Sequence, residues 1–278
     1  MKKRDGEKKI EKLLYELATE GILTDVVVQK EDNCMWENVL LEEKEQSAVL
    51  CVTDDVVCFQ TLKRKSIPVV AYLHEENRNE DFSQAEYAIE EIEEITFDSL
   101  KLVYQRLTGQ PWTILSTKRC IVRETTTNDV DAFYEIYKEP SITFYMENLY
   151  EDREEEKAYL EDYRKKVYGF YGYGIWTVLE KESGKVIGRA GISWREGYDV
   201  PELGYVIAVP FQGKGYAYEV CQAILEYGKK ELGFYEYQVL IMEGNERSED
   251  LCRKLGFQDA GEVMLDGSLH KRMLWKAL

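Results

Sequence analysis

A strand, a glycine-containing loop and a helix start follow one another over residues 202–217, and this succession most constrains what the chain can fold into. The apolar run 202–209 has the length and composition of a buried strand. Gly213 and Gly215 then provide backbone that an anion can approach closely. The free N–H groups and positive dipole end of a helix beginning here would bind a phosphate. The segment therefore predicts a site for a phosphorylated ligand.

The loop lacks the spacing of two common phosphate-binding motifs. A dinucleotide fingerprint needs G-x-G-x-x-G, and a P-loop needs G-x-x-x-x-G-K-[ST]. Here Gln212, Gly215 and Ala217 form the pattern Gln-x-x-Gly-x-Ala. This pattern resembles the acyl-CoA-binding motif of the GNAT superfamily of N-acyltransferases.

The elements expected in the second half follow in the order of that superfamily's fold, from residue 117 to the C-terminus. The resemblance therefore implies a mixed, mostly antiparallel sheet with flanking helices. Hydrophobic periodicity and capping residues predict strands over 119–123, 175–180, 186–195, 202–209, 235–242, 257–265 and 270–275, and helices over 130–137, 151–167, 217–228 and 245–255.

The resemblance implies acetyl-CoA as the acyl donor. In GNAT proteins the strand before the loop splays from its neighbour, and its backbone receives the pantetheine arm. Val206, Ile207 and Lys214 are expected to contact the arm and the pyrophosphate. For the side chains of Val206 and Ile207 the alternative is core packing, and for Lys214 it is a solvated cation beside the site. Asn245 opens an N-x-x-S pattern; it would cap the next helix and hydrogen-bond near the pantetheine. The other residues expected along the arm and pyrophosphate are Ala208, Val209, Gln212, Gly213, Gly215, Tyr216 and Ala217.

Acetyl transfer to an amine needs a base, and an acid for the leaving thiolate. Glu202, in the sequence Glu-Leu-Gly-Tyr, is the base candidate by resemblance to RimJ/RimL-like ribosomal-protein acetyltransferases; a solvated carboxylate is the alternative. The family's usual acid is a tyrosine seven residues after the asparagine, and here that position is Cys252. Ser248 or Cys252 could donate instead, or the thiolate could leave unaided, or catalysis could be weak. A buried structural thiol is the alternative for Cys252.

An aromatic segment at 168–174 precedes the strand expected from Ile175. Its rings could line an acceptor pocket and hold an ammonium group by cation–π contact, or they could simply pack in a loop. Trp176, Trp194 and Tyr145 are weaker candidates for the same pocket.

The first half alternates helix and strand signals, which predicts a small Rossmann-like domain with a parallel sheet. Gly109-Gln110-Pro111 then breaks the chain, so we expect domains at 1–112 and 117–278. The expected elements of the first domain are helices over 7–19, 56–65 and 98–107, and strands over 25–29, 48–52, 67–72 and 85–89.

The order of the elements over 49–89 resembles the second half of a haloacid-dehalogenase-like hydrolase, with Thr53-Asp54-Asp55 at the position of its metal-binding acid. The nucleophile motif D-x-D-x-[TV] is absent, so neither a phosphoenzyme nor a complete magnesium site is expected. We interpret the domain as degenerate and non-catalytic: it binds, dimerises or supports its neighbour. A retained phosphohydrolase or nucleotide-binding role is the remaining hypothesis.

The formal net charge of −17 argues against nucleic acid as a partner, because binding to phosphates requires lysine and arginine. It suits a cationic substrate, although solubility alone also explains it. Six cysteines without C-x-x-C spacing and two histidines predict no metal site and reduced thiols, as in the cytoplasm. The sequence contains no apolar span of about 20 residues, so we expect no membrane helix.

The sequence therefore predicts an α/β acetyl-CoA-dependent N-acetyltransferase that acts by direct transfer in a ternary complex. Its acceptor would be a primary amine, either a protein N-terminus or a small amine. The alternative is an acyl-CoA-binding sensor or regulatory protein without catalysis. The sequence leaves a homodimer open.

Overall fold

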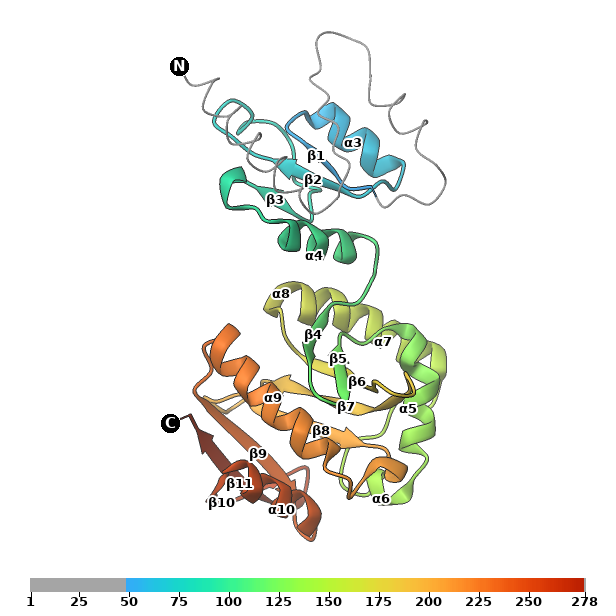
Figure 1. Ribbon diagram of the computed structural model, residues 1–278, viewed down its shortest axis with the longest axis vertical. Helices are drawn as coiled ribbons and strands as arrows, with labels where there is room; N and C mark the ends of the chain where they lie inside the picture. Colours follow the sequence, from blue (N-terminus) through green and yellow to red (C-terminus); the bar gives the residue numbers. More distant parts are fainter. Residues whose placement is uncertain (1–48, 278) are drawn as a thin grey trace. The chain divides into compact units, whose positions relative to one another are not determined.

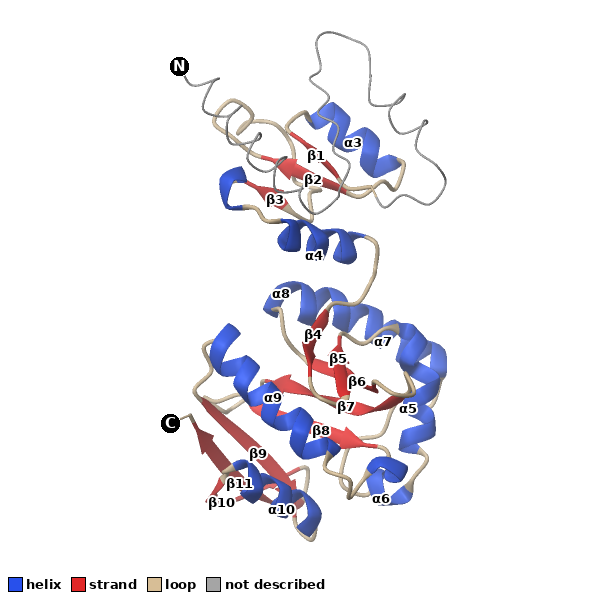
Figure 2. Ribbon diagram, viewed as in Figure 1, coloured by secondary structure: helices blue, strands red, loops and turns tan. Residues whose placement is uncertain are grey.

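The computed structural model describes residues 49–277, which form two compact units. One unit ends at Gln110 and the other begins at Pro111. The expected helix over 7–19 and strand over 25–29 lie outside the described residues. Figures 1 and 2 show the elements of both units.

The first unit contains a three-stranded sheet in the order β1-β2-β3, in which β2 pairs with both neighbours in parallel. Val69 and Ala71 pack with Phe59 of a helix on one face, whereas Val70 on the other face packs against a second helix. Helices therefore cover both faces, as parallel sheets require. The elements are β1 (Cys51–Thr53), α3 (Val56–Arg64), β2 (Val69–Tyr72), β3 (Ala88–Ile89), η1 (Ile92–Glu94) and α4 (Phe97–Leu107).

Asp54 and Asp55, which stand at the position of the hydrolase family's metal-binding acid, have local roles in this unit. The side chain of Asp55 accepts a hydrogen bond from Cys58 N at 2.6 Å and caps α3. Asp54 lies 3.3 Å from the ring of His74. Within residues 49–277 there is no cluster of histidine, cysteine or carboxylate side chains that could hold a metal ion.

The second unit is built on an eight-stranded sheet in the order β10-β11-β9-β8-β7-β6-β5-β4. All neighbours are antiparallel except β8 and β9, which are parallel. The strands are β4 (Thr113–Ser116), β5 (Cys120–Arg123), β6 (Ile175–Glu180), β7 (Val186–Ser193), β8 (Glu202–Ile207), β9 (Glu236–Met242), β10 (Gln258–Leu265) and β11 (Ser268–Lys276).

Helices cover both faces of this sheet, because the strands alternate their side chains between two cores. Leu203 of β8 packs with Val220 and Ile224 of α9, whereas Val206 packs with Ile136 and Ile142 on the opposite face. The helical elements are η2 (Thr127–Asp129), α5 (Val130–Tyr137), α6 (Pro140–Thr143), α7 (Arg153–Tyr163), η3 (Arg164–Tyr168), α8 (Gly169–Tyr171), η4 (Val209–Phe211), α9 (Tyr216–Glu231) and α10 (Glu246–Leu255).

This architecture confirms the expected fold class, a small parallel sheet followed by a mixed, mostly antiparallel one. Strand β4 was not expected, since its four residues carry little periodicity. The helix expected over 151–167 is regular only to Tyr163 and continues as a π-helical turn to Tyr168. No helix among the residues that the structure describes is long and apolar enough to cross a membrane.

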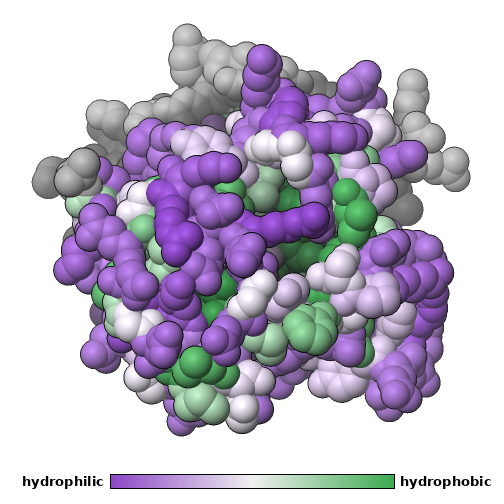
Figure 3. Space-filling view, turned by 90° about the horizontal axis from the view of Figure 1, so that it is seen from below, coloured by the Kyte–Doolittle hydropathy of each residue, from purple (hydrophilic) through white to green (hydrophobic). Residues whose placement is uncertain are grey.

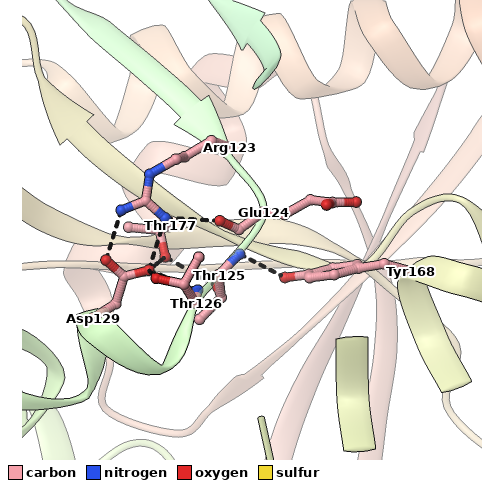
Figure 4. A network of polar contacts seen from close by, with 7 residues as sticks. All are labelled: Arg123, Glu124, Thr125, Thr126, Asp129, Tyr168 and Thr177. Atoms are coloured by element: carbon pink, nitrogen blue, oxygen red, sulfur yellow. Dashed lines mark hydrogen bonds and ion pairs between the residues drawn. The ribbon is translucent and has the colours of Figure 1, made fainter. Parts of the chain in front are cut away.

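A buried polar network fixes the start of the second unit (Figure 4). Asp129, 3% exposed, accepts two hydrogen bonds from the guanidinium of Arg123, at 2.8 and 2.6 Å. It also accepts from Thr126 N and from the Thr177 hydroxyl, so β5, η2 and β6 meet on one carboxylate. Tyr168 joins the network through a 3.3 Å hydrogen bond from Thr125 N. A buried charge is tolerated when it is paired and hydrogen-bonded in this way.

Candidate active site

Strands β8 and β9 separate almost as soon as they meet. Their one register pair is Glu202 with Gln238, and Gln238 N donates to Pro201 O at 2.9 Å. Beyond this pair, the edge of β8 that faces β9 has no partner strand. Unpaired backbone groups of this kind need another partner. The result is a wedge between β8 and β9, bounded by α10.

The glycine loop lies at the carboxyl end of β8 and leads into α9. Gly213 and Gly215 have φ angles of +71° and +82°, a region that favours glycine. A Cβ on Gly213 would meet no atom within 4 Å, so the space above the loop is open. Among the described residues, the backbone N–H groups from Gly213 to Tyr218 have no acceptor. The loop thus presents a row of free donors at a helix N-terminus, which suits a phosphate.

Arg119 braces this loop, although no sequence motif indicates this role. Its backbone N–H and its Nε donate to Glu219 of α9, both at 2.7 Å. Its Nη1 donates to Lys214 O at 2.9 Å, and its guanidinium stacks on the Tyr216 ring. The hydrogen bond to Glu219 is the main cause that raises the pKa of Arg119. Because Arg119 and Glu219 are 100 residues apart, no local pattern could have paired them.

The other residues expected along the donor fall into two groups. Val206, Ile207 and Ala208 are buried, so they can offer backbone but little side chain. Tyr216 is also buried, and its hydroxyl donates to Glu180. The exposed or half-buried residues are Val209, Gln212, Gly213, Lys214, Gly215 and Ala217.

Gln212 and Asn245 hold the two sides of the wedge. The Gln212 side chain donates to Ile207 O at 2.8 Å and accepts from Arg247 of α10 at 3.2 Å. Asn245 caps α10, accepting from Ser248 N at 3.2 Å, as its position predicted. Both residues therefore shape the wedge, whatever further contact they make with a ligand.

Tyr205 of β8 meets two residues of α10 inside the wedge. Its hydroxyl lies 2.7 Å from the Ser248 hydroxyl and 4.0 Å from the Cys252 sulfur. Cys252 is fully buried, and burial raises the pKa of its thiol to about 11. Burial likewise raises the pKa of Tyr205 well above its ordinary value. Of the three, the buried thiol is the least accessible to a ligand.

Glu202 begins β8 on the face opposite Tyr205. Its Oε2 accepts a hydrogen bond from Arg195 Nε at 2.7 Å. That hydrogen bond, with the charge of Glu202 and that of nearby Glu147, raises the pKa of Arg195. Gln238, the register partner of Glu202, is buried, and its Nε2 has no hydrogen-bond partner in the described part of the chain.

An open cavity of about 560 Å³ surrounds Glu202. Two further carboxylates, Glu147 and Glu196, line it, and neither has an ion-pair partner within residues 49–277. None of its lining residues comes from the aromatic segment 168–174, where an acceptor pocket was one expectation. The other lining residues are Tyr159, Tyr163, Ile175, Ser193, Trp194 and Arg195.

Of the weaker aromatic candidates, the structure brings Trp194 alone to the cavity. Trp176 is fully buried in the core, so its assignment to an acceptor pocket was wrong. Tyr145 donates its hydroxyl to Gly244 O at 3.1 Å, which joins the segment after α6 to the turn after β9. Seen from the side on which α6 and α10 lie, the surface has a hollow with a hydrophobic floor and a hydrophilic rim (Figure 3).

The second unit thus has two parallel strands, β8 and β9, that part beside a glycine loop, within a mixed, mostly antiparallel sheet. Residues 119–258 match the acetyltransferase (GNAT) domain family. This match spans half of the chain, and the chain belongs to the GNAT acetyltransferases. It is an acyl-CoA N-acyltransferase of the GNAT type.

Relatives and solved structures resemble the second half of the chain. The uncharacterized protein YkkB of Bacillus subtilis is 30% identical over 123 residues, which cover 44% of this chain and 70% of the relative. The ribosomal protein uS5-alanine N-acetyltransferase of Escherichia coli is 30% identical over 121 residues, 41% of this chain and 60% of the relative. The structure of RimL, a ribosomal L7/L12 acetyltransferase in complex with coenzyme A, matches with a TM-score of 0.50. The match covers 60% of this chain and 98% of RimL. Its sequence identity of 14% means that it shows the fold alone.

Proposed function

We propose that the chain transfers an acetyl group from acetyl-CoA to a positively charged primary amine that enters the cavity around Glu202. The observation that supports this most directly is the arrangement of the two sites. The wedge and the glycine loop lie along β8 and beyond its carboxyl end, and the cavity lies at its start. A donor and an acceptor bound on the two sides would meet at this strand, as direct transfer in a ternary complex requires.

The glycine loop is suited to the pyrophosphate of acetyl-CoA. Its free N–H groups from Gly213 to Tyr218 supply hydrogen bonds and the positive end of the α9 dipole. Lys214 is exposed beside the loop and adds positive charge. From Leu203 to Val206, the edge of β8 that faces β9 has no partner strand and can receive the amides of the pantetheine arm. When bound, acetyl-CoA supplies the activated acetyl group.

The cavity is suited to an ammonium group. Glu147 and Glu196 supply negative charge beside the Glu202–Arg195 ion pair, and Trp194 and the two tyrosines of α7 supply ring faces. Glu202 would accept the proton of the attacking amine, directly or through a water. Its hydrogen bond to Arg195 holds the carboxylate in one orientation. A small amine and a protein N-terminus both carry this charge, and both are candidate acceptors.

A direct test is to mix the protein with acetyl-CoA and a panel of amines and follow the free thiol of CoA. The panel contains spermidine, putrescine and peptides that begin with alanine or serine. We expect thiol release with at least one cationic amine. Binding of acetyl-CoA without thiol release on any acceptor contradicts the proposal.

That second outcome would favour the alternative function, an acyl-CoA sensor. Two observations motivate it: Cys252 stands where the family has its tyrosine acid, and Arg195 donates a hydrogen bond to each oxygen of the Glu202 carboxylate. In a sensor, the glycine loop would still bind acetyl-CoA. Calorimetry would then detect binding, while the assay would detect no release of free CoA thiol.

The family match begins at Arg119, so the role of the first unit stays a prediction. Its parallel sheet is compatible with the degenerate hydrolase-like domain expected from the sequence, and with a role in homodimerisation. Sedimentation of the full chain, with and without CoA, tests the second of these roles.

A further inference from the structure

The reaction needs a proton for the leaving thiolate, and the position where the family carries its tyrosine is Cys252. That thiol is fully buried. A phenol nevertheless lies in this part of the wedge, contributed by a strand instead of by α10: the Tyr205 hydroxyl is 4.0 Å from the Cys252 sulfur. Unlike Cys252, Tyr205 is partly exposed.

We propose that Tyr205 of β8 is the general acid of this enzyme and that Ser248 of α10 is its positioning residue. This inference rests on the proposed function. The Ser248 hydroxyl lies 2.7 Å from that of Tyr205 and can donate to it, which leaves the phenol proton free for the wedge. Ser248 is itself fixed, because its backbone N–H donates to Asn245 at the start of α10.

The proton balance is complete with these groups. The bound ammonium group first loses one proton to water, which gives the neutral amine. The amine nitrogen then forms a bond to the carbonyl carbon of the acetyl group, the C–S bond breaks, and its electron pair stays on sulfur. The sulfur takes the phenol proton of Tyr205, while the proton lost by the amine passes to Glu202. After the products leave, Tyr205 regains a proton from water and Glu202 loses one to water.

The surroundings of Tyr205 keep its phenol protonated until the thiolate forms. Burial, with smaller contributions from the thiols of Cys252 and Cys221, raises the pKa of Tyr205, whereas the hydrogen bond with Ser248 lowers it less. These three groups, two from α10 and one from α9, are the titratable or polar side chains that face the phenol.

The first test compares Tyr205→Phe with Ser248→Ala, using acetyl-CoA and either spermidine or an alanine-initiated peptide. General acids typically contribute about 10²-fold or more to rate. We expect Y205F to lower kcat by about 10²-fold with the Kd for CoA unchanged, and S248A to lower it less. Tyr237→Phe removes the hydroxyl of a fully buried tyrosine on β9 and serves as the matched control.

A kcat of Y205F within twofold of wild type overturns the role of Tyr205, and so does a deeper loss in S248A than in Y205F. A wild-type protein that binds CoA but releases no thiol with either amine overturns the proposed function itself. The two failures are therefore distinguishable.

The second test keeps the phenol and changes its acidity. With 3,5-difluorotyrosine at position 205, whose phenol is more acidic, kcat should fall at a lower alkaline pH than in the wild type. The ¹⁹F resonance of the same protein should shift when CoA is added, and shift less with desulfo-CoA, because the sulfur is the proposed contact. The proposal is overturned if kcat falls at the same alkaline pH as in the wild type. It is also overturned if CoA and desulfo-CoA shift the ¹⁹F resonance equally.

Discussion

At the scale of single residues, the site depends on which side chains face which ligand. Successive residues of a strand point to opposite faces. Glu202 therefore faces the acidic cavity, while Tyr205, three positions on, faces the wedge and α10. One strand thus presents a carboxylate on the cavity side and a phenol on the wedge side.

Replacing Glu202 by Gln tests the base. The amide keeps the size of the side chain but cannot accept a proton from the amine, so we expect kcat to fall by about 10²-fold. The Kd for CoA should stay within twofold, because Glu202 lies outside the glycine loop. Arg195→Met is the matched control: it removes the same ion pair but keeps the carboxylate, and should cost less. Equal rates for E202Q and wild type would remove Glu202 from the mechanism.

At the scale of elements, the position of the glycine loop depends on a brace between the start of β5 and the start of α9. Arg119 holds both Glu219 and the carbonyl of Lys214. We expect Arg119→Met to weaken CoA binding severalfold while kcat at saturating acetyl-CoA changes little, as calorimetry and steady-state kinetics would measure.

Glu219→Gln separates two explanations of that result. If Arg119 acts by holding the loop, E219Q should weaken CoA binding as well, because it loosens the same brace. If Arg119 acts only as a cation beside the phosphates, E219Q should leave the Kd unchanged. That second pattern would contradict the brace.

The same elements show how far the sequence could predict the site. The glycine loop and the cap at Asn245 were predictable, since their requirements are local: positive φ angles and a side chain that reaches a helix N–H three residues on. The pairs Arg119 with Glu219 and Tyr205 with Ser248 were not, because the fold joins segments 100 and 43 residues apart. The cavity likewise combines α7 with the loop between β7 and β8, so aromatic residues in one local segment were a poor guide to it.

The buried network of Figure 4 gives a stability prediction at this scale. Asp129→Asn removes the charge that holds Arg123, Thr126 and Thr177 together. Breaking a buried pair by removing one partner costs about 3 to 5 kcal/mol, so urea unfolding of the second unit should show a loss of this order. The control is Asp131→Asn. The side chain of Asp131 pairs with Arg153 but is 84% exposed, so this change should lower the free energy of unfolding far less. Similar losses in both variants would contradict the network's role.

At the scale of the whole molecule, the net charge of −17 acts on an approaching cation before it reaches the cavity. Salt screens such long-range attraction, since the Debye length falls from about 10 Å at 0.1 M to about 3 Å at 1 M. At saturating acetyl-CoA, we therefore expect KM for spermidine to rise with salt while kcat stays nearly constant. A singly charged amine should show a shallower rise, because the attraction scales with the charge of the substrate.

The contribution of the cavity can be separated from that of the overall charge by Glu196→Gln. This change alters the net charge by one unit in 17 but removes one of two unpaired carboxylates in the cavity. If the cavity carboxylates dominate, E196Q should raise KM for spermidine severalfold at low salt and flatten its salt dependence. If the overall charge dominates, E196Q should behave like the wild type. A KM that does not change with salt for either amine would mean that the acidic surface serves solubility alone, the explanation that the sequence left open.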